Sequence, residues 1–176
     1  MMFKKSPQTQ VRAKRVLAID PGFGRAGVAV LERDGDRDIL LYSSCIVTEK
    51  TEAFIDRLQR VVTEVEVLLE KFGPELMALE RLYFATNQKT AMQVSEVRGA
   101  LLSLAGKHHL SVVEYTPLQV KIAITGFGRS GKRELMRMIP LLIEMPKSTK
   151  RLDDEYDAIG IGITALAAHR PSSIAE

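Results

Sequence analysis

Four acidic residues occupy positions where carboxylates are available for chemistry. Asp20 and Glu80 each end a short apolar run and directly precede a turn or loop, which is where open α/β sheets present functional groups. Asp154 and Asp157 are three residues apart at the start of a helical pattern, so they share one helix face. If the runs that end at Asp20 and Glu80 form adjacent parallel strands, both carboxylates emerge at one sheet edge, where their repulsion requires a cation.

This arrangement predicts a magnesium site. Magnesium prefers carboxylate oxygens, and a pair of such ions can activate water and stabilise the leaving oxygen of a phosphodiester. That chemistry needs neither histidine nor cysteine. Helix capping and the helix dipole also favour acids in a first helical turn, and for Asp154 taken singly this ordinary explanation is the stronger one. The helix that follows Asp157 is mostly apolar, however, and burial of its acidic start would require a partner such as a metal ion.

Hydrophobic patterning predicts the elements that position these acids. Short apolar or β-branched runs indicate five strands, and apolar residues at helical spacing indicate four helices. The expected strands are Val16–Ile19, Ala26–Leu31, Ile39–Val47, Leu76–Leu79 and Ser111–Tyr115, and the expected helices are Phe54–Phe72, Thr90–Lys107, Lys132–Ile143 and Asp154–His169. This order predicts an α/β protein of RNase H-like fold, with a mixed five-stranded sheet and helices on both faces.

Composition limits the remaining possibilities. The chain has 176 residues, 45% of them hydrophobic and 27% charged, which is typical of one globular domain. We expect a flexible basic arm over residues 1–14, an RNase H-like domain over 15–170 and a tail over 171–176. No run resembles a membrane span or a secretory signal, so a cytoplasmic protein without a membrane partner is expected. The net charge of +3 permits a nucleic-acid partner. Cys45 is the only cysteine and is expected to be a packing residue.

One segment mimics a nucleotide-binding motif. Residues 126–132 have the glycine and lysine spacing of a phosphate-binding P-loop, but Arg133 replaces the Ser or Thr that would hold magnesium. A P-loop also follows an early strand, whereas only two expected helices come after this segment. Nucleotide hydrolysis is therefore rejected. A glycine-rich turn with Arg129 and Lys132 nearby remains a suitable seat for a DNA phosphate.

Several short motifs in this order resemble the RuvC family of Holliday-junction resolvases. The resemblance covers roughly residues 15–169. It rests on Ile19-Asp20-Pro21-Gly22, Leu79-Glu80-Arg81-Leu82-Tyr83, Arg98-Gly99, Gln119-Val120-Lys121 and Asp154-x-x-Asp157-Ala158.

The resemblance implies a structure-selective endonuclease that resolves four-way DNA junctions during recombination and repair. It implies symmetric nicking of two opposed strands by a homodimer, leaving 5′-phosphates, with possible partners in the branch-migration proteins RuvA and RuvB. The implied cofactor is Mg²⁺, two ions per active site, with Mn²⁺ as a substitute. The implied catalytic and metal-binding residues are Asp20, Glu80, Asp154 and Asp157.

The resemblance also implies DNA contacts. Tyr83 corresponds to an aromatic residue that stacks on or wedges between bases at the junction centre, although in this sequence alone it is equally well explained as a packing residue. Lys121 and Lys132 match basic positions used on DNA phosphates, and as isolated lysines they read as surface charges. Arg81 stands where relatives often have a neutral polar residue.

Other functions share some of these features. Another RNase H-like nuclease, acting on RNA–DNA hybrids or other branched DNA, would carry the same acids. An inactive junction-binding scaffold would be expected to lose one of them. A phosphotransferase of the actin and sugar-kinase fold needs two such domains, for which 176 residues are too few.

Overall fold

The computed structural model describes residues 14–81, 88–146 and 151–169, and it contains one five-stranded sheet. The strand order is β3-β2-β1-β4-β5. The strands are β1 (Arg15–Asp20), β2 (Arg25–Asp34), β3 (Arg37–Val47), β4 (Leu76–Glu80) and β5 (Ser111–Tyr115). The first three form an antiparallel meander, and β4 and β5 run parallel to β1. The predicted mixed sheet is confirmed.

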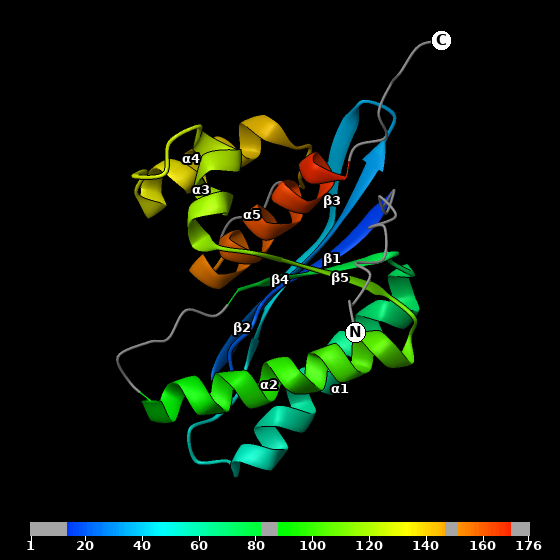
Figure 1. Cartoon of the computed structure of the whole chain (residues 1–176), viewed down its shortest axis with the longest axis vertical. Coiled ribbons are helices and arrows are strands. Elements are labelled where there is room, and N and C mark those ends of the chain that lie inside the picture. Colours follow the sequence, from blue (N-terminus) through cyan, green and yellow to red (C-terminus); the bar gives the residue numbers. More distant parts are fainter. Residues whose placement is uncertain (1–13, 82–87, 147–150, 170–176) are drawn as a thin grey trace, which may run out of the picture.

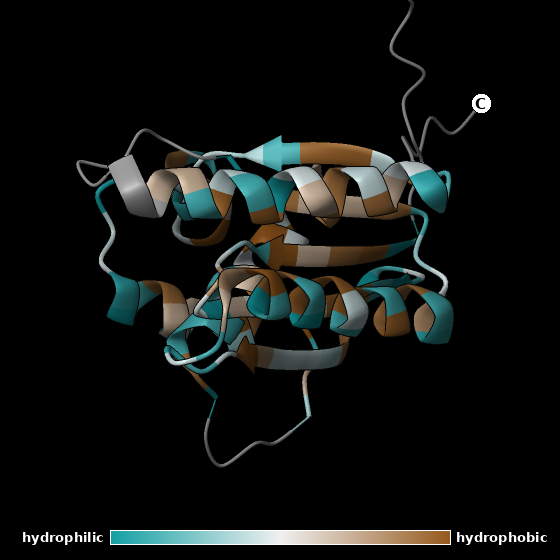
Figure 2. Cartoon of the chain, turned by 90° about the horizontal axis from the view of Figure 1, so that it is seen from below, coloured by the Kyte–Doolittle hydropathy of each residue, from teal (hydrophilic) through white to brown (hydrophobic). Residues whose placement is uncertain are grey.

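Helices cover both faces of the sheet, as predicted (Figure 1). One layer holds α1 (Phe54–Phe72) and α2 (Gln88–Lys107), and the other holds α3 (Pro117–Thr125), α4 (Lys132–Leu142) and α5 (Asp153–Ala168). Alternation along the strands explains the two layers: in β1, Leu17 and Ile19 face α1 and α2, whereas Val16 and Ala18 face α5. In Figure 2 the strands are largely hydrophobic, whereas the helices also carry hydrophilic residues.

The helix α3 was not predicted from the hydrophobic pattern. It has only nine residues and no clear apolar stripe, so its periodicity is weak. The signals that were available lie at its ends. Thr116 and Gln119 form a reciprocal capping box, Pro117 occupies the first turn, and Gly126 closes the helix with a φ of 74°.

Within the described residues, no helix is long and apolar enough to cross a membrane. The predicted arm and tail lie mostly outside these residues, so the predicted domain boundaries stay predictions.

The helix α5 packs closely across the middle of the sheet because it carries glycine where the contact is tightest. A Cβ on Gly162 would lie 2.3 Å from Leu31 Cδ1 and 3.3 Å from the Ala18 Cβ. Both neighbours are fully buried, so neither can move aside without disturbing the core. The backbone of α5 therefore lies directly over β1 and β2.

We predict that Gly162→Ala lowers the free energy of unfolding by about 1–3 kcal/mol, the usual cost of overpacking a core. Urea denaturation followed by circular dichroism measures this change. Gly106→Ala is the matched control, because nothing lies within 4 Å of a Cβ at that helical site. We expect the control to be neutral or slightly stabilising, and equal losses in both variants would contradict the packing explanation.

Candidate active site

Two of the candidate acids meet at the ends of neighbouring parallel strands. Ile19 of β1 is in register with Leu79 of β4, so the next residues, Asp20 and Glu80, leave the sheet at the same edge. Their carboxyl groups share a hydrogen bond. The local sequence turns sharply after Asp20, where a Cβ on Gly22 would lie 2.0 Å from the carbonyl oxygen of Arg25.

This pair is electrostatically unusual. Burial raises the pKa of Asp20 to about 8, and the negative charges of Glu80, Asp157 and Asp154 contribute in the same direction. Burial also raises the pKa of Glu80, and its hydrogen bond with Asp20 offsets part of that rise. At neutral pH the Asp20 carboxyl therefore retains a proton, which it shares with Glu80.

The other two acids come from the start of α5, which lies against β2 at Gly27. A Cβ on Gly27 would stand 1.9 Å from the backbone oxygen of Asp154, so only glycine permits this approach. Gly27 pairs with Asp20 across the β1–β2 ladder. The contact therefore brings the first turn of α5, with Asp154 and Asp157, to the edge where Asp20 and Glu80 lie.

A carboxylate clamp fixes the same end of α5. Glu155 Oε1 accepts a hydrogen bond from the Leu152 backbone N–H at 3.1 Å, and its Oε2 accepts one from the Ser43 hydroxyl at 2.9 Å. Arg151 Nε donates to the same Ser43 oxygen at 3.3 Å. The clamp joins the start of α5 to β3, across β2 from Asp20.

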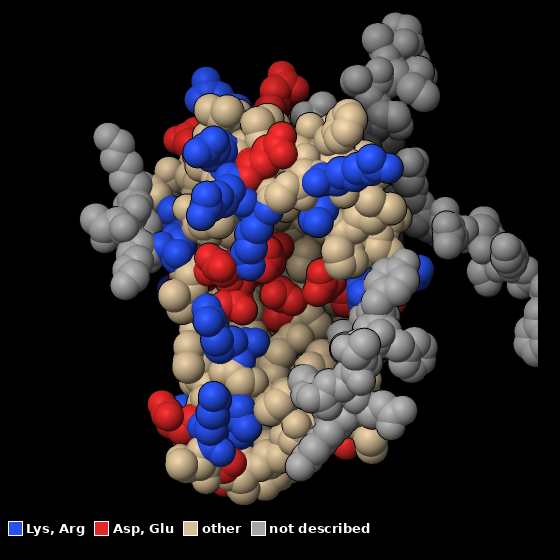
Figure 3. Space-filling view, turned by 90° about the vertical axis from the view of Figure 1, so that its left-hand side faces the viewer, with Lys and Arg blue, Asp and Glu red and all other residues tan. Residues whose placement is uncertain are grey.

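Cations of the protein compensate the α5 acids. Asp154 forms an ion pair with Arg25, and the Cys45 thiol lies 3.8 Å from its Oδ2. Asp157 Oδ2 accepts a hydrogen bond from Lys132 Nζ at 2.8 Å. Burial tends to lower the pKa of Lys132, but the hydrogen bond and charge of Asp157 outweigh it, so the pKa is raised. On the side where α5 begins, Figure 3 shows acidic residues gathered in a central hollow with basic residues above and below.

The donor set suits a hard divalent cation, because it consists of carboxylates that are partly desolvated and repel one another. Across the described parts of the chain, no three His, Cys, Asp or Glu side chains stand in a finished metal-binding arrangement. In this structure Asp154 faces Arg25, Asp157 faces Lys132, and Asp20 faces Glu80.

Of the predicted DNA-binding residues, one lies at the acid cluster and two lie on or next to the helices α3 and α4. Lys132 lies at the acid cluster. Lys121 is half-buried on α3, Arg129 is exposed in the turn before α4, and within the described residues neither pairs with an acid. Tyr83 lies outside the described residues. The P-loop-like segment joins two helices and its Lys132 amine is bound to Asp157, which agrees with the rejection of a nucleotide site.

Sequence analysis missed two residues that the structure places at the site. Gly27 carried a usable signal, because a glycine inside an apolar strand often marks the close approach of another backbone. Arg25 carried none, since an arginine after a glycine-rich turn is ordinary, and only the tertiary structure shows that it faces Asp154.

Comparison with known proteins gives consistent matches over most of the chain. The family model described as crossover junction endodeoxyribonuclease RuvC matches residues 16–165. The protein of that name from Petrotoga mobilis is 40% identical over 144 residues, which is 82% of this chain and 88% of the relative. Its counterpart in Ruminiclostridium cellulolyticum is 35% identical over 159 residues, which is 90% of this chain and 95% of the relative.

Solved structures agree with the sequence matches. The structure titled "T. thermophilus RuvC in complex with Holliday junction substrate" is similar with a TM-score of 0.82 and 30% identity, covering 89% of this chain and 95% of that one. The yeast mitochondrial Holliday junction resolvase Ydc2 has a TM-score of 0.69 at 16% identity, covering 90% of this chain and 79% of that one. The second match shows a shared fold.

We predict that Asp20→Asn stabilises the protein in chelator-containing buffer. With its pKa raised from 3.8 to about 8, Asp20 keeps its proton in the folded state while the unfolded chain releases it. The wild type therefore loses stability as pH rises from about 4 to 8, and asparagine removes this loss. We expect a gain of roughly 1–3 kcal/mol at pH 7.5 that shrinks towards pH 4.

Denaturant unfolding at pH 4, 6 and 7.5 measures the effect. Asp36→Asn, in the exposed β2–β3 turn, is the control and should leave stability nearly unchanged at each pH. A loss of stability in Asp20→Asn at pH 7.5 would show that the Asp20 carboxylate is satisfied in the folded protein and would refute the predicted strain.

Proposed function

Because this chain belongs to the RuvC family of crossover junction endodeoxyribonucleases, we propose that Asp20, Glu80, Asp154 and Asp157 bind the metal ions of its nuclease site. The chain is an endonuclease that resolves Holliday junctions in recombination and repair. RuvC-family nucleases depend on a metal ion.

The observation that carries the site proposal is the crowding of carboxylates around Asp20. Burial and three acidic neighbours raise its pKa to about 8. An ionised Asp20 therefore lowers the stability of the folded protein unless a cation compensates its charge. We propose Mg²⁺ as the natural ion, two per active site, with Mn²⁺ as a substitute. When bound, such ions supply Lewis acidity for the in-line attack of water on a phosphodiester.

The residues of the chain have distinct tasks in this proposal. Asp20 and Glu80 would serve as ligands once the proton that they share is released to solvent. Asp154 and Asp157 would hold the ions with the carboxylates that now face Arg25 and Lys132. The two cations are then available to DNA phosphate oxygens, and both are accessible, with 49% and 45% of their side chains exposed. Water is the nucleophile and no covalent intermediate is required.

We propose the DNA substrate and the protein partners from the family to which the chain belongs. Binding of four-way junction DNA is supported by the solved junction complex of the Thermus relative. We propose a homodimer, because a junction presents two opposed strands for symmetric cutting. Contacts of Lys121, Arg129 and Lys132 with phosphates, stacking by Tyr83, and association with RuvA and RuvB belong to the same proposal.

The decisive experiment is cleavage of an end-labelled four-way junction by the wild type and by Asp20→Asn, with magnesium or with chelator. We expect paired, symmetric and ligatable nicks from the wild type with magnesium only. The variant should bind the junction and lose cleavage by at least about 10³-fold, because the metal site is incomplete.

Linear duplex and RNA–DNA hybrid serve as control substrates. Cleavage of the hybrid in preference to the junction would assign the chain to a ribonuclease activity. Junction binding by the wild type without any cutting would instead favour a scaffold.

We further predict that Gly27→Ala reduces junction cleavage by roughly 100-fold, because a shift of about 1 Å in catalytic groups has effects of that size. The added Cβ would displace the start of α5 and separate Asp154 and Asp157 from Asp20 and Glu80. Single-turnover cleavage at saturating enzyme measures the chemical step. Gly106→Ala, at an open helical site, should cut normally. A Gly27→Ala protein that cuts at the wild-type rate would show that this contact does not position the acids.

A further inference from the structure

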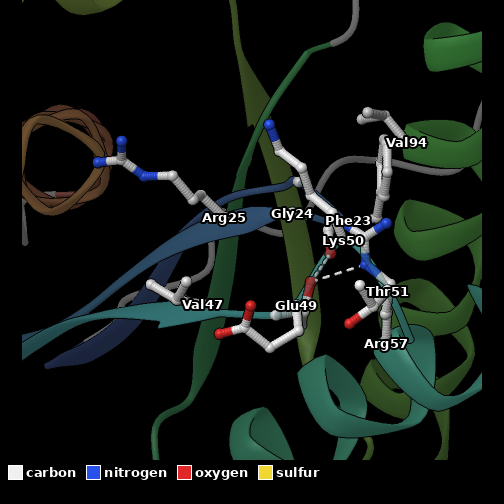
Figure 4. Close-up of a pocket in the computed structure, with 11 residues that line it drawn as sticks. Phe23, Gly24, Arg25, Val47, Glu49, Lys50, Thr51, Arg57 and Val94 are labelled. Atoms are coloured by element: carbon white, nitrogen blue, oxygen red, sulfur yellow. Dashed lines mark hydrogen bonds between the residues drawn. The ribbon is translucent and has the colours of Figure 1, made fainter.

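A groove of about 600 Å³ lies beside the acid cluster. Its walls are formed by the turn after Asp20, the end of β3 with the loop that follows it, the first turn of α1, and Val94 of α2 (Figure 4). Arg25 stands at the boundary, because it lines the groove and also pairs with Asp154. The groove therefore continues directly from the proposed nuclease site.

A buried arginine is the main polar feature of this groove. Arg57 is only 8% exposed and lines the groove. Its Nε donates a hydrogen bond to the Thr48 hydroxyl at 2.9 Å, and its guanidinium lies 4.6 Å from the centre of the Phe23 ring. Thr48 in turn donates to the Phe23 carbonyl oxygen at 2.5 Å. These contacts fix the orientation of the guanidinium, and among the described residues Nε is the one Arg57 nitrogen that donates a hydrogen bond.

The charge of Arg57 is not neutralised by a neighbour that the structure describes. Within residues 14–81, 88–146 and 151–169, no Asp or Glu forms an ion pair with it. Glu49 is the acid that lines the groove, and in Figure 4 its carboxylate points away from the Arg57 guanidinium. A buried cation without a counter-ion is costly, so the groove favours an anionic ligand.

The other lining residues suit a nucleotide better than a free anion. Lys50 is exposed and is a second cation among the residues that line the groove. Phe23, Val47 and Val94 give apolar walls from three different segments. Apolar surface can take a sugar or base, while a planar guanidinium and a lysine hold phosphate oxygens. Cations and apolar walls thus line one groove, which Arg25 links to the acid cluster.

We propose that this groove binds a backbone phosphate, with its sugar, of the DNA strand being cut, next to the phosphate at which cleavage occurs. Arg57 and Lys50 hold that phosphate, and Arg25 lies between it and the acid cluster. The inference rests on the proposed function for the identity of the strand. It adds a binding site that lies outside the four acids and outside Lys121, Arg129 and Lys132.

The test is a scan of neutral methylphosphonate groups along the strand of a synthetic four-way junction, one position at a time around the cleavage site. Binding is measured with full-length Asp20→Asn protein, so that the junction stays intact. We expect one neutral position beside the cleavage site to raise the Kd about 5-fold or more. When Lys50→Ala is added, the methylphosphonate at that position should change the Kd by less than about 2-fold. The dependence of the Kd on salt concentration should fall by the amount of about one phosphate contact.

Two further variants sharpen the result. Lys71→Ala, an exposed lysine at the other end of α1, is the matched control and should keep the full sensitivity at that position. Arg57→Lys keeps the positive charge but loses the guanidinium. It should raise the Kd for the junction and reduce the effect of the same methylphosphonate, while thermal melting shows a folded protein. If the Lys50 and Arg57 substitutions each reduce the effect of the same single methylphosphonate and of no other, the result supports phosphate binding in the groove.

A Lys50→Ala protein with undiminished sensitivity at every position would overturn the proposal, as would an equal loss of sensitivity in Lys71→Ala. Failure of the proposed function is seen separately, as the absence of junction cutting by the wild type with magnesium. If the wild type cuts the junction normally but neither substitution changes the effect of any methylphosphonate, the proposed groove site is rejected and the proposed function stands.

Discussion

The close contact between the start of α5 and the β2 backbone at Gly27 is the constraint on which the site depends. Strand ends bring Asp20 and Glu80 together, because parallel pairing of β1 with β4 fixes their edge. The acids of α5 can join them only if a helix backbone touches a sheet, and a side chain at Gly27 would prevent that contact. Glycine at Gly162 allows the same proximity further along the helix.

The packing brings four acids together, and the repulsion between their negative charges opposes it. Four acids near one another destabilise the folded chain, and three local arrangements lower the cost: a proton shared by Asp20 and Glu80, and cations facing Asp154 and Asp157. These partners are replaceable, because a proton, a half-exposed arginine and a half-exposed lysine can each leave without unfolding anything. If these acids bind metal ions as proposed, the folded chain has a higher affinity for divalent cations and a lower stability without them.

The neighbouring groove holds a buried positive charge, as the cluster holds buried negative charges. Arg57 is held by Thr48 and Phe23, which orient the guanidinium without neutralising it. The negative cluster and the positive groove meet at Arg25. A polyanionic strand that crosses this face would meet cations on one side of the acids and, at Lys132, on the other. In the proposed complex, such a distribution would align a phosphate backbone and leave the four acids to the metal ions.

Much of the fold could be predicted from the sequence, because alternation and helical periodicity record burial directly. The five strands, the two helix layers and the carboxyl-end positions of Asp20 and Glu80 follow from local patterns, whereas the short helix α3 lacks a stripe and was missed. The roles proposed for the acids come from the family motifs. Only the tertiary structure could decide that Arg25 faces Asp154, that Gly27 admits α5, and that Arg57 lines a groove beside the acids. These are contacts between segments far apart in the chain, and no local residue pattern encodes which distant partner a side chain meets.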